Sequence, residues 1–167
     1  MTTDSHKGLE QVMPGAWPDC TLAARNIRKE LKTAFPGFKF SVKTRRYSMG
    51  DSIDITWTDG PSREEVERIT GKYQEGEFNG MIDLYEDHNA PFNQLYGGTK
   101  YVFCNRGISD KVLQVVINSI WERYGLDGPV ITPKDFQKGN AWEIKISDDL
   151  NVQDLIHRAI SELPSLL

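Results

Sequence analysis

The sequence predicts an α+β protein, a mixed or antiparallel sheet with helices packed on one face, in the order α-β-β-α-β-α-β-β-α. Three observations lead there. Apolar residues recur at helical spacing in four segments, other segments alternate apolar and polar residues, and turn residues separate the two kinds. With 167 residues, the chain has the size of one domain. We expect that domain at residues 19–167, behind a flexible lead-in at residues 1–18 whose Trp17 anchors it to the core.

The first helix begins at Asp19, a favourable N-cap, and ends near Phe35, before a Pro-Gly pair. Helical spacing puts its apolar and basic residues on opposite faces. The apolar face holds Ala23, Ile27, Leu31, Ala34 and Phe35. The basic face holds Arg25, Arg28, Lys29 and Lys32.

A β-hairpin follows, because residues 38–43 and 53–58 alternate apolar and polar side chains around a turn at residues 45–51. One hairpin face packs on the helices. The other face displays Lys39, Lys43 and Arg45 beside Ser52, Asp54 and Thr56.

A second helix starts near Pro61 and presents apolar residues as far as Tyr73. Residues 74–98 are predicted to form a long loop, because glycines and a proline break every periodic pattern there. A third strand at residues 100–105 follows. An alternative arrangement has two subdomains joined by the 74–98 segment.

The C-terminal third predicts a strongly apolar helix that is capped by Ser109 and ends at Gly125. Residues 129–132 and 141–146 are predicted to be two short strands, separated by a polar linker. A last helix is expected at about residues 152–163.

Composition favours a cytoplasmic protein. No apolar run approaches the roughly 20 residues of a membrane span, and the N-terminus has no signal-peptide pattern. Cys20 and Cys104 lie far apart without metal-ligand spacing, which favours free buried thiols in a reducing compartment. Charge is unevenly distributed: residues 25–46 hold eight Lys or Arg and one Glu, whereas the whole chain has a net charge of −4. A cationic patch on an acidic protein usually faces phosphates or an acidic partner.

The predicted contact surface is this basic helix and hairpin, with Tyr47 available to stack on a base. Its candidate residues are Arg25, Arg28, Lys29, Lys32, Lys39, Lys43, Arg45, Arg46 and Tyr47. The predicted partner is nucleic acid or a host nucleoprotein complex. The hypothesis requires that helix and hairpin direct their cations outward together as one continuous surface.

Two other functions are alternatives. Asp83, Glu86, Asp87 and His88 form an acid-rich segment that imitates a nucleic-acid backbone if the protein is a protein–protein inhibitor. A small enzyme would use His88 or Cys104, but no catalytic motif, metal-ligand spacing or phosphate-binding glycine loop occurs. We therefore predict no catalytic residues, no metal and no cofactor. The residues do not predict an oligomeric state.

Residues 20–110 resemble the large polyvalent protein-associated domains, in particular the twenty-ninth of that series. Four segments carry the resemblance: AFPG at 34–37, KFSV at 39–42, WTDGP at 57–61 and KYVF at 100–103. Such domains occur in phages, plasmids and conjugative elements, fused into large proteins or alone. The resemblance implies a role in establishing the element and evading host defence, of the anti-restriction or anti-CRISPR kind. It supplies no catalytic residues and does not extend beyond about residue 110.

Overall fold

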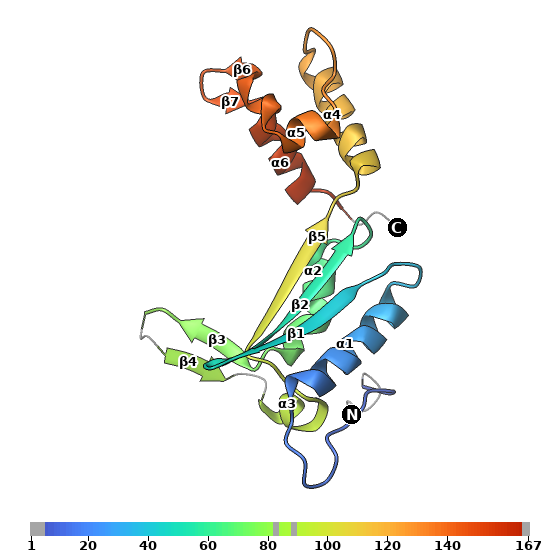
Figure 1. Ribbon diagram of the computed structural model, residues 1–167, viewed down its shortest axis with the longest axis vertical. Helices are drawn as coiled ribbons and strands as arrows, with labels where there is room; N and C mark the ends of the chain where they lie inside the picture. The colour runs from blue at the N-terminus through green and yellow to red at the C-terminus, as the bar shows by residue number, and fades with distance from the viewer. Residues whose placement is uncertain (1–5, 82–83, 88–89, 165–167) are drawn as a thin grey trace. The chain divides into compact units, whose positions relative to one another are not determined.

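The computed structural model describes residues 6–81, 84–87 and 90–164 (Figure 1). Its chain folds into two compact units, Met1–Arg106 and Gly107–Leu167, and each is described by itself. The division follows Arg106, so the 74–98 segment lies inside the first unit and does not join two subdomains. Whether residues 19–167 behave as one domain stays a prediction.

The first unit is built on a three-stranded sheet in the order β1-β2-β5 (Figure 1). The elements β1 (Ser41–Tyr47) and β2 (Gly50–Thr58) form an antiparallel hairpin, as predicted. The predicted turn at residues 45–51 is wrong, because residues 45–47 pair with residues 50–52 and extend the two strands. The third strand, β5 (Tyr101–Gly107), runs in the same direction as β2. Accordingly, Lys100 lies against Gly50 at one end, and Arg106 donates a hydrogen bond of 2.9 Å to the Gly60 carbonyl at the other. The sheet is therefore mixed, as expected.

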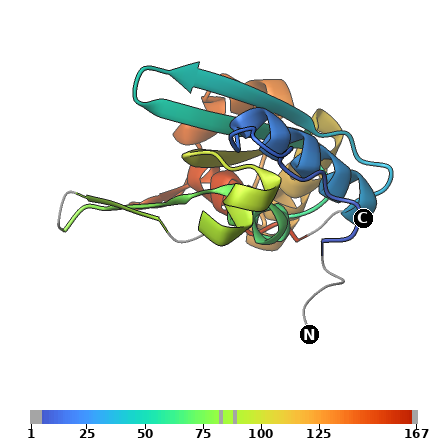
Figure 2. The same ribbon diagram turned by 90° about the horizontal axis from the view of Figure 1, so that it is seen from below.

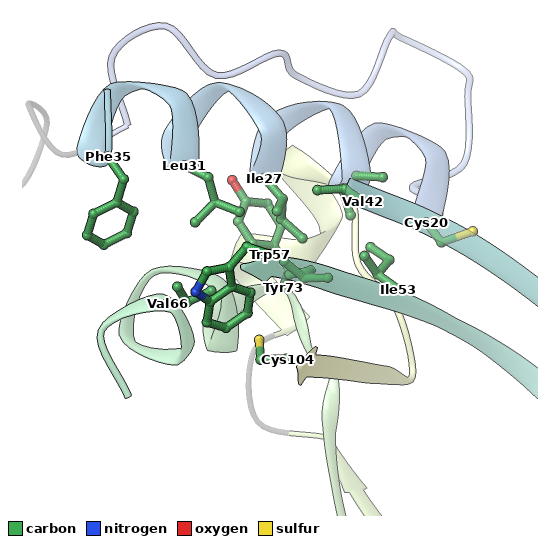
Figure 3. Close-up of a cluster of buried hydrophobic side chains, with 13 residues drawn as sticks. Cys20, Ile27, Leu31, Phe35, Val42, Ile53, Trp57, Val66, Tyr73 and Cys104 are labelled. Carbon is green, nitrogen blue, oxygen red and sulfur yellow. The ribbon is translucent and has the colours of Figure 1, made fainter. Parts of the chain in front are cut away.

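Two helices cover one face of this sheet, which confirms the predicted α+β class (Figure 3). The first, α1 (Cys20–Ala34), is capped by the Asp19 carboxylate, which accepts a 2.9 Å hydrogen bond from Leu22 N–H. The second, α2 (Arg63–Thr70), begins with a capping box of Ser62 and Glu65 and continues into the 3-10 helix η1 (Gly71–Tyr73). Their shared core includes Ile27, Leu31, Val42, Ile53, Ile55, Trp57, Val66, Tyr73 and Cys104.

The prediction of a long loop at residues 74–98 is wrong, because this segment contains a hairpin and a helix. Strands β3 (Gly76–Asn79) and β4 (Leu84–Asp87) pair antiparallel and extend away from the helices (Figures 1 and 2). Helix α3 (Ala90–Tyr96) then packs its Phe92 ring against Tyr73, with centroids 5.1 Å apart. Tertiary contacts, rather than sequence periodicity, determine these elements.

The described part of the lead-in is attached to the helices. The buried Asn26 side chain accepts a 2.7 Å hydrogen bond from Glu10 N–H and donates to the carbonyls of Glu10 and Tyr96. Val12 N–H donates to Leu95 O at 2.8 Å. Trp17 was expected to anchor this segment, but it is 90% exposed. The attachment therefore comes from the backbone of residues 10–12 and from the His6 ring, which packs against Phe92 and Tyr96.

The second unit packs α4 (Asp110–Tyr124) and α6 (Val152–Ser161) around a separate apolar core. Ser109 caps α4, and Gly125 ends it in the left-handed conformation, as predicted. Helix α6 is capped by Asn151.

The two strands predicted in this unit are partly wrong. Residues 129–132 form no strand, and the expected polar linker is α5 (Pro133–Gln137). Thr132 and Asp135 make a capping box around Pro133, and Phe136 is buried, so a short helix begins there. The rest comprises η2 (Asn140–Glu143) and a hairpin of β6 (Lys145–Ser147) with β7 (Leu150–Asn151).

None of the helices in the described chain is both long enough and apolar enough to cross a bilayer.

Candidate functional site

Strand alternation separates the predicted cations onto opposite sides of the sheet. Val42 of β1 is buried against α1, so its neighbours Lys43 and Arg45 point to the opposite face. We call the exposed residues around α1 the helix group: Arg25, Arg28, Lys29, Lys32 and Lys39. We call those on the uncovered side of the sheet the sheet group: Lys43, Arg45 and Tyr47. The nine predicted residues therefore do not form one continuous surface.

An acid from the lead-in compensates two members of the helix group. Glu10 lies 2.8 Å from Lys29 Nζ and 3.3 Å from Arg25 Nε. The pKa of Glu10 is lowered, chiefly by the hydrogen bond from Lys29. Both pairs are half-exposed and can exchange with solvent ions, since such surface pairs contribute only about 0–1 kcal/mol.

The other three cations of the helix group line one hollow of about 410 Å³ at the C-terminal end of α1. Arg28 donates a hydrogen bond to the Val42 carbonyl. Because this acceptor is neutral, the hydrogen bond does not compensate the positive charge of Arg28. Lys32 and Lys39 are exposed. In the described ranges, none of these three side chains has a carboxylate within ion-pair distance.

Aromatic residues form the apolar wall of this hollow, namely Phe35, Phe38 and Phe40. Phe40 contacts both Phe35 and Trp57, with centroids 6.0 Å and 5.6 Å apart. Phe38 lies over Gly60, where a Cβ atom would come within 2.5 Å of its ring. The Phe38 ring can occupy this position only because Gly60 has no side chain. Gly60 also has a φ of 65°, which favours glycine. The wall is consequently built into the fold.

Arg46 points back toward α1 and leaves the predicted surface. Its guanidinium is 3.0 Å from the Asp19 carboxylate and 3.1 Å from Thr21 Oγ1. Its pKa is raised, first by a hydrogen bond with Cys20 and then by the nearby charges. Asp19 thus caps the helix and holds Arg46 at once, a structural role.

The sheet group lies beside Asp54 and Asp51 of β2. Arg45 Nε is 2.9 Å from Asp54 Oδ2, an ion pair that lacks the angle of a hydrogen bond. Tyr47 donates to the Asp51 carbonyl at 3.0 Å and keeps 46% of its surface exposed. Its pKa is raised by partial burial and by the neighbouring Tyr101, Asp51 and Asp54. Tyr47 therefore lies near the aromatic residues of β5.

Two aromatic residues of β5 were missed by the sequence prediction. Val102 and Cys104 pack into the core, so Tyr101 and Phe103 point to the uncovered side of the sheet. Their rings stack with centroids 6.0 Å apart, and Phe103 is 47% exposed. The alternation in YVFC was available as a signal for this placement.

The two alternative functions concern the acid-rich segment and Cys104. Asp83 and His88 lie outside the described residues, and no three potential metal ligands cluster among the residues that the structure describes. Cys20 and Cys104 are free and buried, as predicted. Burial raises the pKa of the Cys104 thiol, whose polar neighbour is Thr70 at 3.5 Å. A raised pKa is the opposite of what an activated nucleophile needs.

The predicted family resemblance is confirmed by comparison with known proteins. A family model described as large polyvalent protein associated domain 29 matches residues 19–109, more than half of the chain. That range runs from the N-cap of α1 to the N-cap of α4 and so covers most of the first unit. Neither the curated proteins nor the solved structures contain a match.

Proposed function

The chain belongs to the large polyvalent protein associated domain 29 family, and we propose that it is a counter-defence protein that binds nucleic acid or a host nucleoprotein complex. The family associates it with phages and other mobile elements. One observation carries the binding proposal: Arg28, Lys32 and Lys39 converge on one hollow without an acidic partner in the described chain.

Uncompensated cations in one place favour a polyanion over a neutral ligand. Each phosphate contact releases condensed counterions, so several contacts together give an affinity that falls steeply with salt. Arg25 and Lys29 lie on the same helix and add to this field when Glu10 exchanges for a phosphate. The aromatic wall of the hollow offers apolar contact to a sugar or base beside the phosphates.

The first experiment measures binding to a labelled DNA duplex over a range of salt concentrations. The test variant combines Arg28→Gln, Lys32→Ala and Lys39→Ala. A matched control combines Lys111→Ala, Lys134→Ala and Lys138→Ala, which removes three exposed charges from the second unit. The test variant should lose affinity and reduce the log–log salt slope by about one per lost contact. Equal effects of test and control would reject the hollow as the contact.

A second experiment addresses the counter-defence role. The protein is used to capture partners from host lysate with and without nuclease. Loss of a defence complex after nuclease treatment supports capture through nucleic acid. Retention of a basic host protein after nuclease treatment instead supports the protein–protein inhibitor.

A further inference from the structure

The sheet of the first unit has a second face, which carries charged, polar and exposed aromatic side chains. This uncovered face lies opposite α1 and α2 (Figure 3). Its outer strands carry the large residues, while the central strand β2 carries small or short ones. Along β1 these are Lys43, Arg45 and Tyr47, along β2 they are Ser52, Asp54 and Thr56, and along β5 they are Tyr101 and Phe103.

Aromatic rings on both outer strands stay accessible. Phe103 is 47% and Tyr47 46% exposed, although burying either ring would stabilise the fold by removing apolar area from water. Between the outer strands, Ser52 is only 3% exposed and lies opposite Arg45 in the strand pairing. Near the hairpin turn, Gly50 keeps space between Tyr47 and Lys100, because a Cβ there would lie 2.7 Å from Lys100 Cδ. The rings thus border a shallow sheet surface.

Cations accompany the rings on the same face. Lys43 is exposed and makes no ion pair in the described part of the chain. Arg45 pairs with Asp54, but its side chain is 70% exposed. The Asp54 side chain is only 20% exposed, so the pair through Arg45 Nε is kept and a phosphate meets the remaining N–H groups of the guanidinium. Aromatic rings beside cations suit a ligand that offers base faces and phosphates together.

We propose that this uncovered face binds single-stranded nucleic acid, with Phe103 and Tyr47 stacking on bases and Lys43 and Arg45 contacting phosphates. The inference rests on the proposed nucleic-acid binding and names the form that is bound. A duplex keeps its base faces inside its own stack, so the rings have partners only in an unpaired strand. The hollow of the helix group lies on the other side of the sheet and is the contact proposed for backbone phosphates.

The experiment compares a labelled oligothymidylate with a labelled duplex of random sequence, by fluorescence anisotropy at fixed salt. Phe103→Ala should weaken oligothymidylate binding by about 5- to 150-fold, the range for one lost base stack. The same variant should leave duplex binding within about twofold. Phe103→Trp keeps a ring and should retain most of the affinity. Thr56→Ala, on the same face, is the matched control without an aromatic ring.

The outcomes separate this inference from the proposed function. If the Phe103→Ala variant binds oligothymidylate like the wild type, or loses both ligands equally, base stacking at this face is overturned. If only the hollow variant then weakens binding, the hollow remains the contact. If Phe103→Ala acts as expected and the hollow variant matches its control, the hollow is rejected and the sheet face stands. Failure of the wild type to bind either ligand overturns both. A thermal melt of each variant confirms that the fold is retained.

Discussion

The two faces of the β1-β2-β5 sheet show how one set of strands divides between stability and contact. On the covered face, Ile53 and Ile55 are fully buried against α1 and α2. On the uncovered face, their neighbour Asp54 pairs with Arg45, and Thr56 is exposed. Period-two alternation alone produces the division. Neighbouring positions in one strand should therefore differ strongly in how much a substitution destabilises the fold.

The largest effect is expected from removing a side chain of the covered face. Ile53→Ala leaves a cavity in a closed core and should lower the free energy of unfolding by about 2–5 kcal/mol. Thr56→Ala, on the opposite face of the same strand, should lower it by less than about 1 kcal/mol. Urea unfolding of both variants measures the contrast. Similar losses would mean that the two faces are not energetically distinct.

A smaller effect is expected at Asp51, which joins the hairpin to the segment before β5. Its Oδ1 accepts hydrogen bonds of 2.9 Å from both Thr99 Oγ1 and Lys100 N–H. Asp51→Ala removes the acceptor that both donors share and should cost about 1–3 kcal/mol by urea unfolding. Asp51→Asn keeps the acceptor oxygen and should recover most of the loss. If Asn is as destabilising as Ala, charge rather than hydrogen bonding is the cause.

The smallest effect concerns the thiol of Cys104 on the covered face. Burial raises its pKa above the ordinary value of 9.0, so the folded protein holds the proton more tightly than the unfolded chain. The stabilisation is complete below pH 9.0 and is lost as pH rises toward the folded pKa. Thermal melts above that pH should therefore show a shallower decline for Cys104→Ala than for the wild type. An identical decline would assign the alkaline loss to Cys20 and Tyr73, whose pKa values are also raised.

Periodicity and capping residues were sufficient to predict the larger elements. Asp19 and Ser109 mark the starts of α1 and α4, and alternation marks β1 and β2. The β3–β4 hairpin and α3 were missed because glycines and a proline interrupt the periodic pattern of this short segment. Its structure depends on strand pairing and on contacts with other elements, such as that of Phe92 with Tyr73. Helix α5 could have been predicted, because Thr132 and Asp135 have the spacing of a capping box and Pro133 stands at the first helical position.

The candidate site was predictable in its residue types but not in its grouping. Lys29 and Lys32 are equivalent in local sequence, yet among the described residues Lys29 pairs with Glu10, ahead of the helix, and Lys32 pairs with no acid. Long-range ion pairs of this kind leave no trace in local spacing. The placement of Lys43 opposite Val42, in contrast, follows directly from strand geometry.

The attachment of residues 10–12 to the helices means that the folded unit includes residues ahead of the family match. The family match starts at residue 19, but an expression fragment cut there would remove the groups that satisfy the buried Asn26 amide. It would also strip the counter-charge from Arg25 and Lys29, making the truncated surface more cationic than the native one. Such a fragment would bind polyanions more readily and fold less stably, so binding assays need the upstream residues kept in place.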